Sequence, residues 1–241
     1  MKIVTWNCQG AFRDKAGLIA SRQPDIAVIQ ECECSEKLKW AKGILPPAAS
    51  LWFGDNPSRG IGIFSWGGWQ FEAHQPYDPN IQYCVPIRVS GSSSFHILAV
   101  WTKDHRRREL GYSSQAYMAT IVYKEFIAAR HTVMIGDLNC NKSSERTPRI
   151  GSPTQVVQTL HDLGMVSAYH WFSHEQHGQE RNATFYLHRS LEKPAHIDYQ
   201  FIPHAWTKYL RQVWVGEPRS WLEYSDHCPL GIELDEPAKP A

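Results

Sequence analysis

The stretch Val133-Met134-Ile135-Gly136-Asp137-Leu138-Asn139-Cys140-Asn141 combines an apolar run with polar side chains at its end. The apolar residues predict a β-strand that leads into Gly136. Because side chains alternate along an extended chain, Asp137 and Asn139 should lie on the same side where the strand ends. Such residues are also common turn formers, so this short pattern by itself favours an ordinary turn. Its meaning depends on how the other strands end.

Polar side chains also occupy the ends of other predicted strands. The apolar run at residues 2–6 leads into Asn7, and the run that starts at Ile26 ends on Glu31. Asp198 and the adjacent Asp226 and His227 occupy comparable positions later in the chain. A sheet presents polar side chains at its rim in this way, which raises the odds that the Asp137 segment is functional.

The chain has 241 residues, of which 42% are hydrophobic and 20% are charged. This composition can bury a large core, and single α/β domains often reach this size. We expect one catalytic domain over residues 1–236 and a short proline-containing tail over residues 237–241. The formal net charge is only +1, so a nucleic acid would have to be bound by a local basic patch.

The six cysteines show no spacing typical of a zinc site, and we interpret them as reduced thiols. Four of them directly follow a predicted site residue and should therefore turn into the core: Cys8, Cys32, Cys140 and Cys228. The N-terminus lacks the apolar region of a signal peptide, and no apolar run has the length of a membrane span. We expect a cytoplasmic protein without membrane association, and no obligate protein partner is evident.

The order of predicted elements indicates an α/β fold. A strand, a helix over residues 15–22 and a second strand open the chain, and a short helix is expected over residues 36–42. Successive strands between residues 50 and 101 should pair as antiparallel hairpins. A long helix is predicted over residues 113–130, and another over residues 154–164 with Thr154 as its cap and Gly164 as its stop. The remaining strands are expected at residues 183–187, 196–203, 210–215 and 229–234.

One segment is strongly basic and follows the strand that ends at Trp101. It contains Lys103, Arg106, Arg107 and Arg108. Short runs of charge are often only solvated loops, and here that explanation and a phosphate-binding role are about equally supported. Trp101 and Phe185 are expected near the same rim, where flat rings beside cations suit unstacked bases or sugars.

The residue types at the strand ends favour a hard cation. Carboxylate and amide oxygens, without thiolates or a histidine cluster, suit Mg²⁺, with Mn²⁺ as a possible substitute, better than zinc. His227 is placed for acid–base work or for stabilising charge on a phosphate, and Asp198 could fix its tautomer. These are the parts that phosphodiester cleavage requires.

The ordered set of motifs resembles the endonuclease/exonuclease/phosphatase superfamily, which includes exonuclease III, apurinic endonucleases and deoxyribonuclease-type enzymes. The motifs are Trp6-Asn7-Cys8-Gln9-Gly10, Ile29-Gln30-Glu31, Gly136-Asp137-Leu138-Asn139, His196-Ile197-Asp198-Tyr199 and Ser225-Asp226-His227. Each motif is weak, but together they cover nearly the whole chain in the expected order. The resemblance implies a four-layer α/β sandwich of two packed mixed β-sheets flanked by helices, with the site at one rim.

The resemblance also implies a role for each strand-end residue. It makes Glu31 the principal Mg²⁺ ligand, with Asn7 and Asp226 nearby. It makes Asp137 and Asn139 the pair that orients the attacking water and binds phosphate.

The same resemblance assigns His227 to phosphate stabilisation or acid–base catalysis, supported by Asp198. Trp101 stands where deoxyribonuclease-like members carry a catalytic histidine. Tyr112 is a counterpart of the tyrosine that the exonuclease III branch places ahead of the long helix, or else a packing aromatic. Thr184-Phe185 resembles the threonine–aromatic segment of the DNA-acting members.

We therefore expect a metal-dependent phosphoric ester hydrolase, and within that class a nuclease that hydrolyses DNA phosphodiester bonds. The alternatives are a phosphatase or phosphodiesterase acting on a small-molecule or lipid phosphate, and an RNase or deadenylase. A non-catalytic binding module is disfavoured because nothing structural requires so many acids at one rim. The choice between DNA and RNA and between endo- and exonucleolytic cleavage stays open at this stage.

Overall fold

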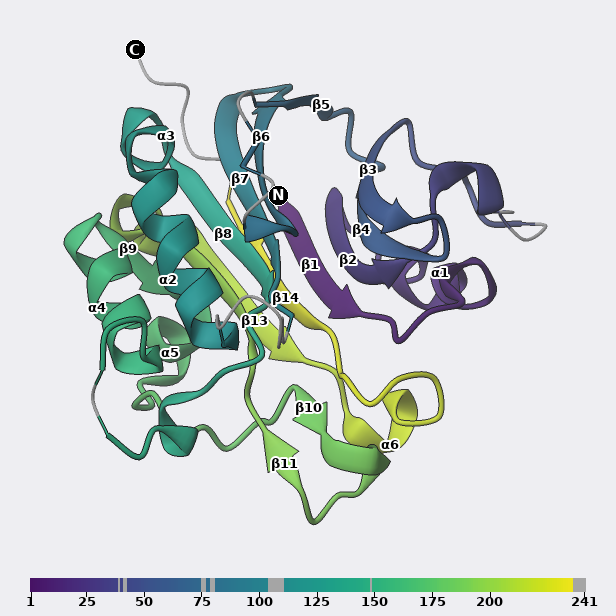
Figure 1. Ribbon diagram of the computed structural model, residues 1–241. Helices are drawn as coiled ribbons and strands as arrows, with labels where there is room; N and C mark the ends of the chain where they lie inside the picture. Colours follow the sequence, from purple (N-terminus) through teal and green to yellow (C-terminus); the bar gives the residue numbers. More distant parts are fainter. Residues whose placement is uncertain are drawn as a thin grey trace.

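The computed structural model describes residues 1–38, 40, 43–74, 77–78, 81–103, 111–147 and 149–235 (Figure 1). In one six-stranded sheet, β1 (Lys2–Asn7) and β2 (Ile26–Cys32) are parallel neighbours connected by α1 (Phe12–Ala20). The strand order is β13-β14-β1-β2-β4-β3, and the other neighbours are antiparallel. These remaining strands are β3 (Ala49–Asn56), β4 (Arg59–Ser65), β13 (Leu210–Val215) and β14 (Leu230–Leu234).

The other six-stranded sheet has the order β5-β6-β7-β8-β12-β9. Its strands are β5 (Gln70–Ala73), β6 (Cys84–Ser90), β7 (Ser94–Trp101), β8 (Thr132–Asp137), β9 (Met165–Ser167) and β12 (Asp198–Pro203). Only β7 and β8 run parallel, whereas the hairpins predicted upstream are antiparallel as expected. A short ribbon of β10 (Phe185–Tyr186) and β11 (Pro194–Ala195) lies beyond the sheets.

Successive side chains of a strand point to opposite faces of its sheet, and this alternation separates the core between the sheets from the two outer cores. Ile3 and Val133 belong to the core between the two sheets, whereas their neighbours Val4 and Met134 belong to two separate outer cores. Val4 packs in the core that contains the buried side chains of α1. Each such aliphatic side chain contributes about 1.5–3 kcal/mol through burial. The four-layer sandwich implied by the sequence is confirmed.

Helices α2 (Tyr112–Val122), α3 (Lys124–Ala129) and α4 (Pro153–Asp162) cover the outer face of the second sheet. Two shorter helices, α5 (Ala168–Ser173) and α6 (Pro218–Trp221), follow later in the chain. None of the helices in the described part of the chain is long and apolar enough to cross a membrane.

The helix expected over residues 113–130 is broken into α2 and α3. Tyr123 leaves the helical region with φ −98° and ψ 20°. Its ring is buried and its hydroxyl accepts a hydrogen bond from the Asp78 backbone N at 2.9 Å, which anchors the chain at this point. Val122, the residue just before this break, is exposed.

Two smaller helix predictions are also wrong. Of the helix expected over residues 36–42, the structure describes residues 36–38 and 40. There Ser35–Lys37 forms a single 3-10 turn and Leu38 is extended, since so short a segment does not recover the cost of helix nucleation. Helix α4 is capped by Ser152, whose hydroxyl accepts from the Gln155 backbone N, and not by Thr154. Gly164 ends the helix as expected, with φ +75°.

The structure describes only the start of the basic segment and does not describe the tail. Lys103 is described, but Arg106, Arg107 and Arg108 lie outside the described residues, as does the expected tail over residues 237–241. The six cysteines are free. Cys8, Cys32 and Cys228 are buried as expected, whereas Cys140 is only half-buried because it lines a surface cavity.

Candidate active site

One end of the sandwich gathers the polar strand ends into a single cavity of about 560 Å³. Its lining includes the predicted residues that the structure describes, with the exception of Asp198, which lies behind His227. The lining also contains Gln9, Arg59 and Thr102, which the sequence did not single out. The register explains the convergence, because Asp137 at the end of β8 is directly opposite both Trp101 of β7 and Asp198 of β12.

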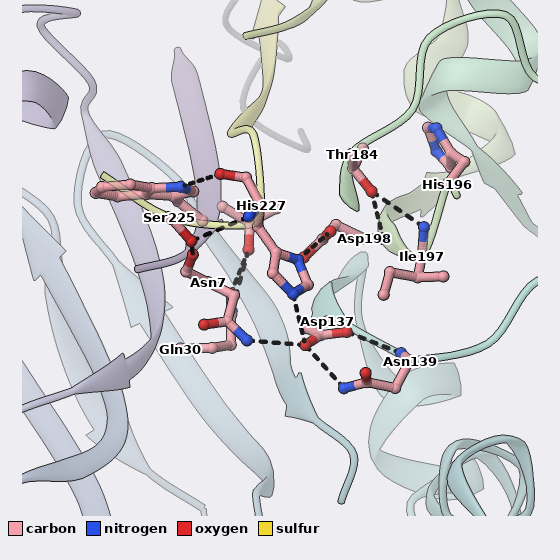
Figure 2. A network of polar contacts seen from close by, with 12 residues as sticks. Asn7, Gln30, Asp137, Asn139, Thr184, His196, Ile197, Asp198, Ser225 and His227 are labelled. Carbon is pink, nitrogen blue, oxygen red and sulfur yellow. Dashed lines mark hydrogen bonds and ion pairs between the residues drawn. The ribbon is translucent and has the colours of Figure 1, made fainter. Parts of the chain in front are cut away.

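Asp137 is fully buried and held on several sides by amide groups (Figure 2). Asn7 Nδ2 donates to Asp137 Oδ2 at 3.0 Å, and Asn139 Nδ2 donates to the same oxygen at 2.8 Å. The Asn139 backbone N donates to Asp137 Oδ1 at 2.8 Å. Asn139 adopts φ +48°, which turns its side chain back toward Asp137. The pair predicted from the Gly136-Asp137-Leu138-Asn139 motif is therefore a single hydrogen-bonded unit.

Gly136 makes this arrangement possible. It has φ +138°, and a Cβ built on it would lie 1.9 Å from the Val100 carbonyl oxygen. Any other residue would push β8 away from β7, since backbone cannot yield as a flexible side chain does. Position 136 of the motif therefore requires glycine for a steric reason, because a side chain there would collide with the backbone of β7.

His227 faces Asp137 from the other side and is paired with Asp198. Its Nδ1 lies 2.9 Å from Asp198 Oδ2, so Nδ1 carries the proton and donates, because a carboxylate oxygen accepts. Its Nε2 lies 3.9 Å from Asp137 Oδ2. Burial alone would lower the pKa of His227, but the carboxylates of Asp198 and Asp137 outweigh it and raise the pKa to about 9. Burial in turn raises the pKa of Asp137.

The hydroxyl groups of Thr184 and Ser225 hold Asp198 and His227 in place, a role that the sequence alone did not indicate. Thr184 Oγ1 accepts hydrogen bonds from the backbone N of Ile197 and of Asp198, both at 3.0 Å. Ser225 Oγ accepts from the His227 backbone N at 3.0 Å and donates to the Asn7 carbonyl at 2.7 Å (Figure 2). Both residues stood inside or beside quoted motifs, but only the tertiary contacts reveal what their hydroxyls bind.

Glu31 also lines the cavity and has an unusual backbone conformation. It has φ +56° at an irregularity in the pairing of β2 with β4. Its Oε1 accepts a long hydrogen bond of 3.4 Å from Asn7 Nδ2. Its Oε2 is buried without a hydrogen-bond partner among the described residues, and the Arg59 guanidinium lies 3.4 Å away. A buried carboxylate oxygen with a free lone pair beside a cavity fits a cation ligand.

A second group of possible ligands consists of Asp137, Asp198 and His227, whose donor atoms lie within 4.8 Å of one another. Within this group His227 and Asp198 already bind each other through Nδ1 and Oδ2, and Asn7 and Asn139 occupy Asp137 Oδ2. This group therefore fits a hydrogen-bonded relay better than a cation site. The oxygen donors around Glu31, with Asp226 also at the cavity wall, fit a hard cation better.

Aromatic rings and a lysine also line the cavity. Lys103 Nζ lies 3.6 Å from the ring centroid of Trp101 and 3.9 Å from that of Tyr83. Burial lowers the pKa of Lys103 to about 8. Phe185 packs against the His227 ring with centroids 4.8 Å apart. Tyr112 begins α2 and is 38% exposed, so its ring is accessible from the cavity.

Solved structures with the same fold exist. The 3′ phosphatase NExo from Neisseria, solved with a product DNA hairpin, is 24% identical with a TM-score of 0.68, covering 98% of this chain and 99% of that chain. An AP endonuclease from Archaeoglobus fulgidus is 17% identical with a TM-score of 0.68, covering 98% of this chain and 99% of that chain. Identities this low show a shared fold alone.

Sequence comparisons give the family. A search among curated proteins finds no match. The sequence pattern of a family of endonucleases, exonucleases and phosphatases matches residues 4–227, which includes every motif from Asn7 to His227. With the fold, the cavity and this match in agreement, the chain belongs to the Endonuclease/Exonuclease/phosphatase family.

Proposed function

We propose that this protein is a divalent-metal-dependent phosphodiesterase whose substrate is DNA. The observation that carries the proposal is the composition of one cavity. The amide-held carboxylate of Asp137 and the imidazole of His227 lie 3.9 Å apart, and the carboxylate of Glu31 lines the same cavity. Glu31 Oε2 has no hydrogen-bond partner among the described residues and is paired with the Arg59 guanidinium at 3.4 Å.

Glu31, Asn7 and Asp226 would hold the cation, with Mg²⁺ as the first choice and Mn²⁺ as a substitute. Their donor atoms are oxygens, and Asn7 already connects Glu31 to Asp137 through its Nδ2. When bound, such a cation neutralises charge on phosphate oxygens and lowers the pKa of a coordinated water.

Asp137, Asn139 and His227 position the reacting groups and handle protons. Asp137 accepts a hydrogen bond from the attacking water and aligns it, because its own rotamer is fixed by Asn7 and Asn139. Asn139 Nδ2 donates to Asp137 Oδ2 at 2.8 Å and to the Thr102 carbonyl oxygen at 3.0 Å, so Asn139 would have to release the Thr102 carbonyl to donate to a phosphate oxygen. His227, held by Asp198, presents Nε2–H to the developing negative charge on the phosphoryl group.

The DNA assignment is supported by the rest of the wall. Lys103 places a cation between two aromatic rings at the cavity edge, and Phe185 and Tyr112 add flat surfaces nearby. Aromatic faces next to a cation suit bases and sugars flanking a scissile phosphate. The Neisseria protein of the same fold was solved with a DNA hairpin, which adds support by analogy.

The test compares substrates under identical conditions. The purified protein is incubated with linear duplex, abasic duplex, single-stranded DNA, RNA and a small generic phosphodiester, each with Mg²⁺ and with chelator. We expect DNA to be cleaved fastest, with complete dependence on the cation. Chelator-resistant hydrolysis would contradict the metal assignment. Faster turnover of a small phosphate ester than of any polymer would replace the nuclease assignment with a phosphatase.

A further inference from the structure

A buried cluster of histidines lies outside the cavity described above. His170 of α5, His177 and Glu180 of the following loop each offer a donor atom, and these atoms lie within 4.8 Å of one another. The side chains of His170 and Glu180 are only 7% and 5% exposed. The ring centroids of His170 and His177 are 3.5 Å apart in a stacked arrangement. These residues take no part in the proposed hydrolysis.

We propose that His170, His177 and Glu180 form a second metal site, for a borderline transition-metal ion such as Zn²⁺. Two imidazole nitrogens and one carboxylate oxygen are ligands that Zn²⁺ prefers, whereas Mg²⁺ prefers a set made of oxygens. The site goes beyond the proposed hydrolase function and does not depend on it.

The ligands are oriented by neighbours, as in established metal sites. His170 Nδ1 lies 2.8 Å from Ser167 Oγ, which fixes the ring and leaves Nε2 directed at Glu180 Oε1, 2.9 Å away. Glu180 Oε1 also accepts from the Gly178 backbone N at 2.9 Å and from Asn141 Nδ2 at 3.0 Å. Such outer contacts hold ligands in position and raise metal affinity.

Ring nitrogens without partners provide an independent observation. His177 Nδ1 is buried and has no hydrogen-bond partner in the described part of the chain. His196, only 3% exposed, lies beside His170, and its Nε2 also lacks a partner among the residues described. Its Nδ1 lies 2.8 Å from the Asn182 carbonyl oxygen and must carry the proton, so Nε2 of the neutral ring bears a lone pair. Coordination would satisfy His177 Nδ1, and His196 packs beside the proposed ligands with its ring centroid 5.7 Å from that of His170.

Binding at His170 Nε2 requires one proton shift. Nε2 currently carries a proton, because its partner Glu180 Oε1 can only accept. A ring coordinated through Nε2 carries its proton on Nδ1 instead, and Ser167 Oγ, 2.8 Å away, can accept that hydrogen bond. Coordination through Nε2 thus moves the ring proton of His170 from Nε2 to Nδ1.

The site would brace the loop that follows the Asp137 and Asn139 pair. Asn141 is two residues beyond Asn139 and donates to Glu180, to the His196 carbonyl at 2.8 Å and to the Tyr199 hydroxyl at 3.0 Å. Gly178 also lies close to Ser143, so the two loops are in direct contact. A metal at Glu180 would hold both loops together.

The experiment uses the full-length protein, stripped of metal with chelator and titrated with Zn²⁺ by calorimetry in excess Mg²⁺. We expect one Zn²⁺ to bind per chain and to raise the melting temperature. Co²⁺ in its place should give the visible absorption of a low-symmetry site. His177→Phe keeps a ring against His170 but removes a ligand, so it should lose the bound Zn²⁺ and the thermal shift. His161→Ala, at an exposed histidine of α4, should bind as wild type does.

Three outcomes would overturn the proposal. They are wild-type protein that takes up no Zn²⁺, a folded His177→Phe variant that binds Zn²⁺ as tightly as wild type, and binding that is lost in Glu31→Gln but retained in His177→Phe. The third would assign the ion to the hydrolase cavity. Should His177→Phe not fold, His177→Ala serves the same purpose, because His177 Nδ1 makes no hydrogen bond among the described residues that truncation would break. Since the titration measures binding alone, its result is independent of whether DNA is cleaved.

Discussion

The hydrolase cavity and the histidine cluster differ in the way the chain builds them. The cavity collects residues from strand ends, with Asn7, Asp137 and Glu31 each at or near the end of a buried strand. The cluster collects residues from a short helix and an irregular loop, and the side chains of His170 and Glu180 are 7% and 5% exposed. Regular strands leave a readable pattern in the sequence, whereas a loop-built site leaves almost none. The two sites also differ in donor type, which allows experiments to separate them.

The largest expected effect is on catalysis at the cavity. Asp137→Asn keeps the shape of the side chain but removes the charge that aligns the attacking water. Turnover should fall by about a hundredfold or more, with a smaller effect on substrate binding. The measurement is steady-state cleavage of duplex DNA, with Asp162→Asn on the exposed surface of α4 as the matched control. Near-normal turnover would mean that the reacting group has been misassigned.

The next largest effect separates the metals of the two sites. Glu31→Gln should abolish the stimulation of cleavage by Mg²⁺ while leaving Zn²⁺ binding at the histidine cluster intact. His177→Phe should show the opposite pattern. Glu72→Gln, on an exposed residue of β5, controls for loss of an acid elsewhere. If the Glu31 variant keeps its response to Mg²⁺, the cation is not held where we propose.

A positioning effect of intermediate size is expected at Thr184. Thr184→Val leaves two buried backbone N–H groups without their acceptor, which should lower the free energy of unfolding by about 1–3 kcal/mol. Turnover should fall on the order of tenfold, because Asp198 would no longer hold His227 firmly. Denaturant unfolding and cleavage rates together check this. Thr184→Ser, which retains the hydroxyl, should restore both values, and failure of that rescue would contradict a hydrogen-bonding role.

The smallest effect concerns substrate binding at the cavity edge. Lys103→Ala should weaken DNA binding several-fold and reduce the slope of log affinity against log salt by about one unit. Cleavage of a small phosphodiester should be unchanged. Lys124→Ala, at the start of α3, provides a lysine that does not line the cavity. An unaltered salt slope in the Lys103 variant would remove this lysine from the DNA-binding surface.

Most of the fold could be predicted because buried strands have simple patterns. The alternation in the Val133 segment places Val133 and Met134 in different cores, as expected. Helix ends were predicted less well, since Ser152 and Thr154 are both competent caps and the choice depends on contacts of the loop before α4. The break at Tyr123 depends on a hydrogen bond to Asp78, a residue 45 positions away in the sequence. Such long-range contacts do not appear in local patterns.

The sequence by itself determined which chemical groups are available and where strands deliver them. The order of the motifs predicted the family, and the alternation predicted that Asp137 and Asn139 share one side. Only the tertiary structure decided that Asn7 bridges Glu31 to Asp137 and that Thr184 supports Asp198. It also brought three ordinary-looking histidines into one buried cluster. The physical reason is the distance along the chain over which each effect acts. The alternation of side chains relates neighbours in sequence, whereas hydrogen bonds and burial relate residues that are neighbours only in space.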